Sequence, residues 1–131
     1  MELDITKVMI LLQRKWNSIR EIHRLTIELE KTFARNDEIS AAMLLQLRSD
    51  EMEKIDQCME EIWQLGETDP VSYEKLCVLI NSDPDEAVGE TAGEKKIYEI
   101  RQRTQVLLDQ LQEADKRLNQ KLAGKKSFYK K

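Results

Sequence analysis

The sequence predicts an all-α protein, an antiparallel bundle of three long helices with one short helix between helices two and three. Three stretches of the chain place apolar residues three or four positions apart, the spacing of one helix face. Residues that cap or end helices stand between these stretches. The alternation typical of strands does not occur. The length of 131 residues suits a single helical-bundle domain over 1–131.

The first helix is predicted over residues 1–35, with Asp4 as its N-cap. It carries two apolar stripes, and an apolar surface this wide normally packs against more than one neighbour. One stripe consists of Ile5, Met9, Leu12, Trp16, Ile19 and His23, and the other of Ile22, Leu25, Leu29 and Phe33.

The second helix is predicted from Glu38 to Leu65, with Gly66 ending it. The corner before it is short, so the first two helices are antiparallel neighbours. In this corner Asn36 suits the left-handed turn that ends a helix, and Asp37 suits the next N-cap. The apolar seam of the second helix consists of Ala41, Leu45, Arg48, Met52, Ile55, Met59 and Ile62.

Arg48 is the polar member of that seam, and a buried arginine calls for a carboxylate partner. The candidates are Asp115 or Glu113 on the third long helix and Glu30 on the first.

A short helix is predicted over 71–80, because Asp69 and Pro70 form an N-cap followed by proline at the first helical position. The acidic segment 81–93 is predicted to be a mobile loop. Thr91 then opens a capping box before the third long helix, predicted over 92–123. Gly124 is expected to end that helix, which leaves 124–131 as a basic tail. The helix carries an apolar series at Ile97, Ile100, Thr104, Leu107, Leu111, Ala114 and Leu118.

Charge and composition narrow the function classes. The net charge is −4, and subtracting the +4 of the four lysines in 124–131 leaves −8 on the rest. An acidic body argues against nucleic-acid binding. No signal peptide and no apolar run long enough to insert in a membrane is present, so we expect a cytoplasmic protein. In that compartment Cys58 and Cys77 are expected to be reduced, small hydrophobic residues.

No catalytic, cofactor or metal-ligand motif is present, so we expect no enzyme and no cofactor. A phosphotransfer domain would need a lysine three positions after its histidine, but Thr26 follows His23 at that place. Arg14, Lys15 and Arg48 could form an anion pocket similar to that of small helical chorismate mutases. Nothing in the sequence fixes that arrangement, so both enzyme interpretations are disfavoured.

A pattern of residues surrounds the corner: Leu25-Thr26, Leu29-Glu30, Phe33, Asn36-Asp37, Leu44-Leu45, Arg48 and Ile55. It resembles the flagellar type III export chaperones of the FlgN/FliT kind. The resemblance implies a cytoplasmic chaperone that binds terminal amphipathic helices of late flagellar substrates, the hook-associated or filament-cap proteins. Such chaperones deliver their substrates to the export gate. The alternative is a helical scaffold that buries its apolar stripe in a homo-oligomer.

The wide apolar surface of the first helix predicts a partner-binding groove between helices one and three. Its expected lining consists of Leu12, Trp16, Ile19, Leu107, Leu111 and Leu118. In the basic tail, Phe128 and Tyr129 are expected to be anchor residues for docking. In the resembled family, C-terminal segments contact the export machinery, and Tyr129 is the residue to which this role carries over.

Overall fold

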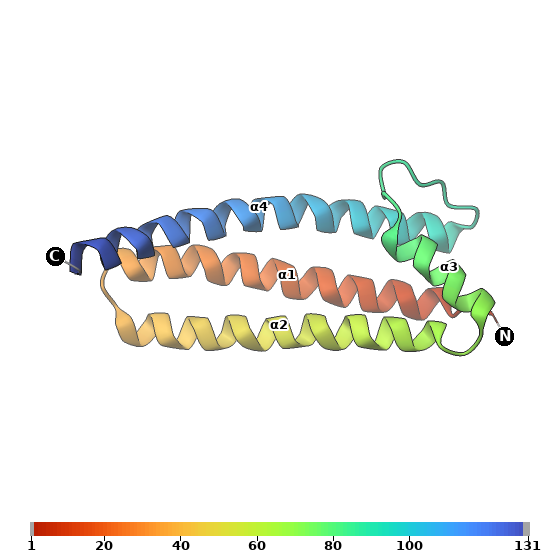
Figure 1. Ribbon diagram of the computed structural model, residues 1–131, viewed down its shortest axis with the longest axis horizontal. Coiled ribbons are helices and arrows are strands. Elements are labelled where there is room, and N and C mark those ends of the chain that lie inside the picture. The colour runs from red at the N-terminus through yellow and green to blue at the C-terminus, as the bar shows by residue number, and fades with distance from the viewer. Residues whose placement is uncertain (1, 130–131) are drawn as a thin grey trace.

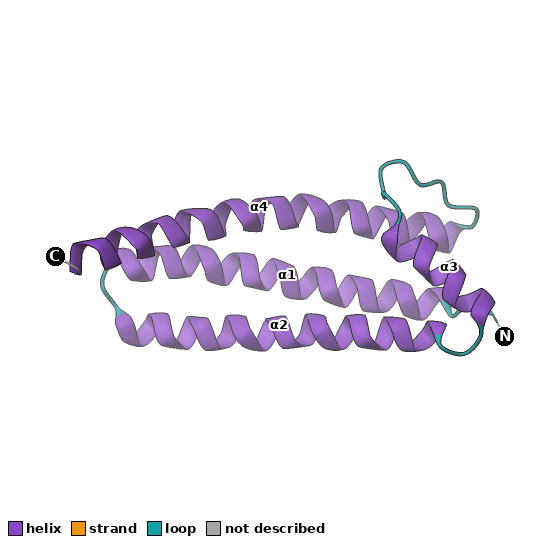
Figure 2. Cartoon of the chain, viewed as in Figure 1, coloured by secondary structure: helices purple, strands orange, loops and turns teal. Residues whose placement is uncertain are grey.

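The computed structural model describes residues 2–129, with side chains described through residue 123. It has three long helices, α1 (Ile5–Ala34), α2 (Glu38–Gly66) and α4 (Ala92–Tyr129), and a short helix α3 (Pro70–Asn81). All regular structure in these residues is helical (Figure 2). α1 runs between α2 and α4, while α3 crosses the end of the bundle at which the chain begins (Figure 1). The predicted fold class is confirmed.

The predicted N-cap residues are confirmed, although α1 begins at Ile5 and not at residue 1. Asp4, Asp37 and Asp69 each accept a hydrogen bond from the backbone N–H three residues later, at 2.8–3.1 Å. Asn36 has a φ of 58°, the left-handed conformation expected of the corner. At the start of α4, the Thr91 hydroxyl oxygen accepts the N–H of the residue three positions on, at 3.2 Å. Local side-chain chemistry therefore sets where each helix begins.

Of the two glycines predicted to end helices, Gly66 is confirmed and Gly124 is not. Gly66 is the last residue of α2, and no described glycine has a positive φ. A Cβ at this position would lie 2.8 Å from Leu76 Cδ2, so Gly66 allows α3 to approach closely. Gly124 lies within α4, which continues to Tyr129. A glycine inside a helix costs only about 1 kcal/mol, and no proline follows to stop the helix.

The predicted tail 124–131 is therefore not a non-helical extension: the backbone is helical through Tyr129. Residues 130 and 131 lie outside the described residues, as do the side chains of 124–129.

The core follows α1 along its whole length, because α2 and α4 each cover one of its apolar sides. Three groups of buried side chains succeed one another along the bundle. The first, around α3, consists of Leu3, Val8, Leu11, Leu12, Ile62, Leu76, Leu79, Ile97, Tyr98 and Ile100. The middle group consists of Ile19, Ile22, Leu107 and Leu111, and the group at the corner of Leu29, Ala41 and Leu118.

The loop between α3 and α4, which Figure 1 shows arching over the end of the bundle, is tied to α4. The side-chain amide of Gln102 donates to the carbonyl of Pro84 at 2.8 Å. Arg101 donates to the carbonyl of Leu79, in the last turn of α3, at 2.9 Å. Ala87 packs against the first core group. These contacts hold the loop and the end of α3 against α4. The mobility expected of this loop stays a prediction.

The contribution of the α3 N-cap, Asp69, to the stability of the fold can be tested by changing the pH. Asp69 accepts hydrogen bonds from the backbone N–H of Ser72, at 2.8 Å, and from its hydroxyl, at 2.9 Å. These bonds, chiefly the one from the backbone, lower the pKa of Asp69 below its ordinary value of 3.8. Because the folded-state pKa is the lower one, the stabilisation is complete above the unfolded pKa. It is lost as the pH falls through the folded-state value.

Asp69→Asn keeps an oxygen acceptor but does not titrate. We expect the melting temperature of the wild type to fall more steeply than that of the variant between about pH 4 and pH 2. Thermal unfolding followed by circular dichroism measures both slopes. Equal slopes would show that this cap does not contribute to the acid sensitivity of the fold.

Candidate partner-binding site

α2 carries a stripe of side chains that faces α4 and is only partly covered. The stripe consists of Leu45, Arg48, Met52, Ile55 and Met59, at steps of three and four residues. It is directed toward α4, because the guanidinium of Arg48 lies 2.5 Å from the Asp115 carboxylate. Leu45 and Met52 are nonetheless 46% and 43% exposed. We call this stripe, together with Leu108 and Asp115 of α4, the α2–α4 seam.

The seam is open because α2 and α4 lie closer to α1 than to each other. Over the described residues, no Cα atom of α2 lies within 8 Å of a Cα atom of α4. α2 contributes only Ala41, Cys58, Ile62 and Gly66 to the buried residues. A further helix laid along the seam would cover its exposed side chains and complete a four-helix arrangement.

The ion pair between Arg48 and Asp115 links the two helices across the seam. It confirms Asp115 among the expected partners of Arg48. Glu30 instead pairs with two cations of α4, Arg117 at 3.0 Å and Lys121 at 3.9 Å. The Nε atom of Arg48 is buried without a hydrogen-bond partner, so the ion pair only partly satisfies the guanidinium.

Toward α3 the seam ends at a cavity of about 140 Å³. Met59 and Leu108 of the seam line it, together with Ile80 in the last turn of α3. Two cations line the same cavity, Lys15 of α1 and Arg101 of α4. The seam thus joins an exposed apolar stripe to a positively charged recess.

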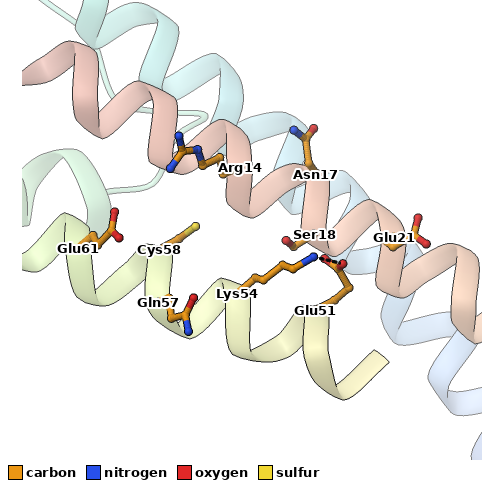
Figure 3. A pocket seen from close by; sticks show the side chains of 9 residues that line it. All are labelled: Arg14, Asn17, Ser18, Glu21, Glu51, Lys54, Gln57, Cys58 and Glu61. Atoms are coloured by element: carbon orange, nitrogen blue, oxygen red, sulfur yellow. Dashed lines mark hydrogen bonds and ion pairs between the residues drawn. The ribbon is translucent and has the colours of Figure 1, made fainter. Parts of the chain in front are cut away.

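A polar cleft of about 470 Å³ lies on the other side of α2, against α1. Figure 3 shows α1 residues facing α2 residues across it, with the Lys54–Glu51 ion pair at 2.7 Å marked by a dashed line. Its one thiol belongs to Cys58, and burial, assisted by Glu61, raises the pKa of that thiol. The thiol is therefore protonated near neutral pH and is a poor nucleophile. The cleft has mixed charge and no activated nucleophile, so its chemistry does not indicate catalysis.

The disfavoured anion pocket of Arg14, Lys15 and Arg48 does not form. Arg14 lines the cleft of Figure 3, Lys15 lines the cavity at the end of the seam, and Arg48 pairs with Asp115. Over the described residues, no three histidine, cysteine or acidic side chains gather in a way that could hold a metal ion. No helix in the same part of the chain is long and apolar enough to cross a membrane.

The structure places the expected groove residues in the core. Leu12, Ile19, Leu107, Leu111 and Leu118 are all buried. Leu12 borders the small cavity at the end of the seam. Otherwise these residues do not line an open groove between helices one and three, because the apolar sides of α1 and α4 pack directly together. This corrects the predicted position of the groove.

Trp16 is partly buried and lies under two guanidinium groups. Those of Arg103 and Arg20 are 4.7 Å and 5.6 Å from its ring centroid. The backbone of Phe128 and Tyr129 is part of α4. Their side chains are not among those that the structure describes.

Leu45 and Met52 belong to the apolar series predicted from the sequence for the second helix, but the predicted binding site does not include them. The signal that could have identified them is the width of the apolar arc on α2. Leu44 and Cys58 lie directly beside the seam positions Leu45 and Met59 and pack toward α1 instead. An arc this wide leaves one edge uncovered when only one helix packs closely against it.

The fold and the seam define a class: a three-helix array built on α1, in which a partly uncovered apolar stripe of α2 faces α4. Comparison with known proteins gives no match to a family model, to a curated protein or to a solved structure. The resemblance to the flagellar export chaperones therefore stays a prediction from the residues at the corner.

Proposed function

We propose that the protein binds an amphipathic helix of a partner protein along the α2–α4 seam. The observation that carries this proposal is the exposure of Leu45 and Met52 between two helices whose backbones are widely spaced and which an ion pair bridges. In helix-in-groove recognition, an amphipathic helix places its apolar face against such a stripe. The bound helix would complete the bundle by covering both side chains.

Charge favours one kind of partner. Glu53, Asp56 and Glu60 are exposed and recur at steps of three and four residues on α2, beside the seam. A helix with basic residues along the flank of its apolar face would complement them, and such charges speed association and fix register. We therefore propose an amphipathic helix whose polar flank facing α2 is basic.

With the resemblance at the corner, this makes the protein a cytoplasmic flagellar export chaperone. Its substrates would be the terminal helices of hook-associated or filament-cap proteins. The C-terminal segment, with Phe128 and Tyr129, would then contact the export gate. The competing function is a scaffold in which a second copy of the chain covers the same stripe.

Light scattering separates these functions. We measure the protein alone and with the terminal helices of hook-associated and filament-cap proteins encoded in the same genome. The proposal expects a monomer that forms a one-to-one complex with at least one of these helices. A stable dimer that binds none of them would favour the scaffold and contradict the chaperone.

A further inference from the structure

Lys15 and Arg101 share the cavity at the end of the seam, and no carboxylate lines it. Lys15 makes no hydrogen bond or ion pair with the described residues. Arg101 uses one guanidinium nitrogen for the carbonyl of Leu79, at 2.9 Å. The side chain of Lys15 and the remaining nitrogens of Arg101 are therefore available to a ligand.

The two charges are unfavourable to one another. Burial lowers the pKa of Lys15, and the nearby charge of Arg101 lowers it further. Burial also lowers the pKa of Arg101. The carboxylate of Asp83 acts on Arg101 in the opposite direction, but it does not line the cavity. Partly desolvated like charges destabilise a fold, and an anion placed between them would relieve both.

The shape and walls of the cavity favour a carboxylate with a short apolar stem. Leu12, Met59 and Leu108 supply apolar wall, and the volume of about 140 Å³ exceeds that of several water molecules. An arginine fork matches the two oxygens of a carboxylate, and a lysine adds a point charge. The amide of Gln105 lines the same cavity and can donate as well.

We propose that this cavity is a carboxylate-binding site, with Lys15 and Arg101 as its cationic ligands. The carboxylate has two sources. It is a free short-chain acid, or it is an acidic side chain on the helix bound along the seam, which ends at the cavity. Only the second source rests on the proposed function.

Sodium butyrate is the probe for the free acid, titrated at constant ionic strength against sodium chloride. We expect saturable NMR shifts of the Arg101 Nε–H and the Lys15 side chain, and a pKa of Lys15 that rises on binding. Lys15→Met, which keeps the aliphatic length, should lose the saturable response at Arg101. It should also melt at a higher temperature than the wild type without butyrate, because an unpaired desolvated charge is gone.

The matched control is Lys54→Met, which removes one lysine from the polar cleft between α2 and α1, away from the proposed site. It should bind butyrate as the wild type does. A non-saturable response in the wild type, or the same saturable response in Lys15→Met, would overturn the proposal.

A second arm identifies the source of the carboxylate. It uses a partner helix that binds the seam and the same helix with its acidic residues changed to Gln one at a time. If the carboxylate comes from the partner, one Glu→Gln or Asp→Gln change should weaken binding about tenfold to the wild type but not to Lys15→Met. If no helix binds the seam, the proposed function fails, while the butyrate titration still decides the carboxylate site.

Discussion

The double substitution Leu45→Asp/Met52→Asp is expected to reduce the affinity for the partner helix by about 100-fold or more, roughly 2.7 kcal/mol. Both side chains are nearly half exposed, and docking would bury what is left of them. Burying a whole leucine or methionine side chain contributes about 1.5–3 kcal/mol, so each loses roughly half of that. Each new carboxylate would also lose water on docking. Isothermal titration calorimetry with the partner helix measures the change.

The matched control is Met43→Asp/Leu47→Asp, which makes the same two residue changes elsewhere on α2. Met43 and Leu47 are 63% and 47% exposed and lie outside the seam stripe. Both double variants should lose about 1–3 kcal/mol of unfolding free energy, because roughly half of each side chain is already buried in the fold, so circular dichroism must first show that both are folded. The control variant should bind as the wild type does. Equal losses of affinity in the two variants would remove the seam as the binding site.

Leu111→Asp is expected to destabilise the fold by about 4 kcal/mol or more. Leu111 is 9% exposed and packs with Ile19, Ile22 and Leu107 in the middle of the core. The substitution removes these contacts and puts a carboxylate at a buried position of the core. Since whole domains are stable by only about 5–15 kcal/mol, much of the protein should be unfolded at room temperature.

Urea denaturation followed by circular dichroism measures the effect, with Gln112→Asp as the control. Gln112 is the next residue of α4 and is exposed, so the control keeps the same helix and the same added charge. It should lie within about 1 kcal/mol of the wild type. A folded Leu111→Asp variant of ordinary stability would mean that α4 does not present this face to α1.

The helices and their starts could be predicted from the sequence because these features depend on near neighbours along the chain. Asp37 and Asp69 cap helices through hydrogen bonds to residues three positions away. Asp115 was among the expected partners of Arg48 because both lie on periodic faces of helices. Gly124 shows the limit: local rules assign it to a helix end, whereas α4 continues past it to Tyr129.

The position of the seam depends on tertiary packing, which the sequence does not specify locally. α1 has two apolar sides, and periodicity alone does not say which side α4 covers. The prediction left a side of α1 and α4 open, whereas Leu107 and Leu118 of α4 are buried. The uncovered side chains are on α2 instead. Lys15 and Arg101 likewise line one cavity only because of how far α1 and α4 are shifted along each other.

The central claim, that a partner helix lies on the α2–α4 seam, is tested most directly by the methyl NMR signals of the methionines. The chain has five methionines, and three of them lie on α2. Met52 and Met59 belong to the seam, and Met43 lies outside it. When the partner helix is added to protein labelled at the methionine methyl groups, the account predicts large shifts for Met52 and Met59 and little change for Met43. A spectrum in which Met43 shifts and Met52 and Met59 stay in place would contradict it.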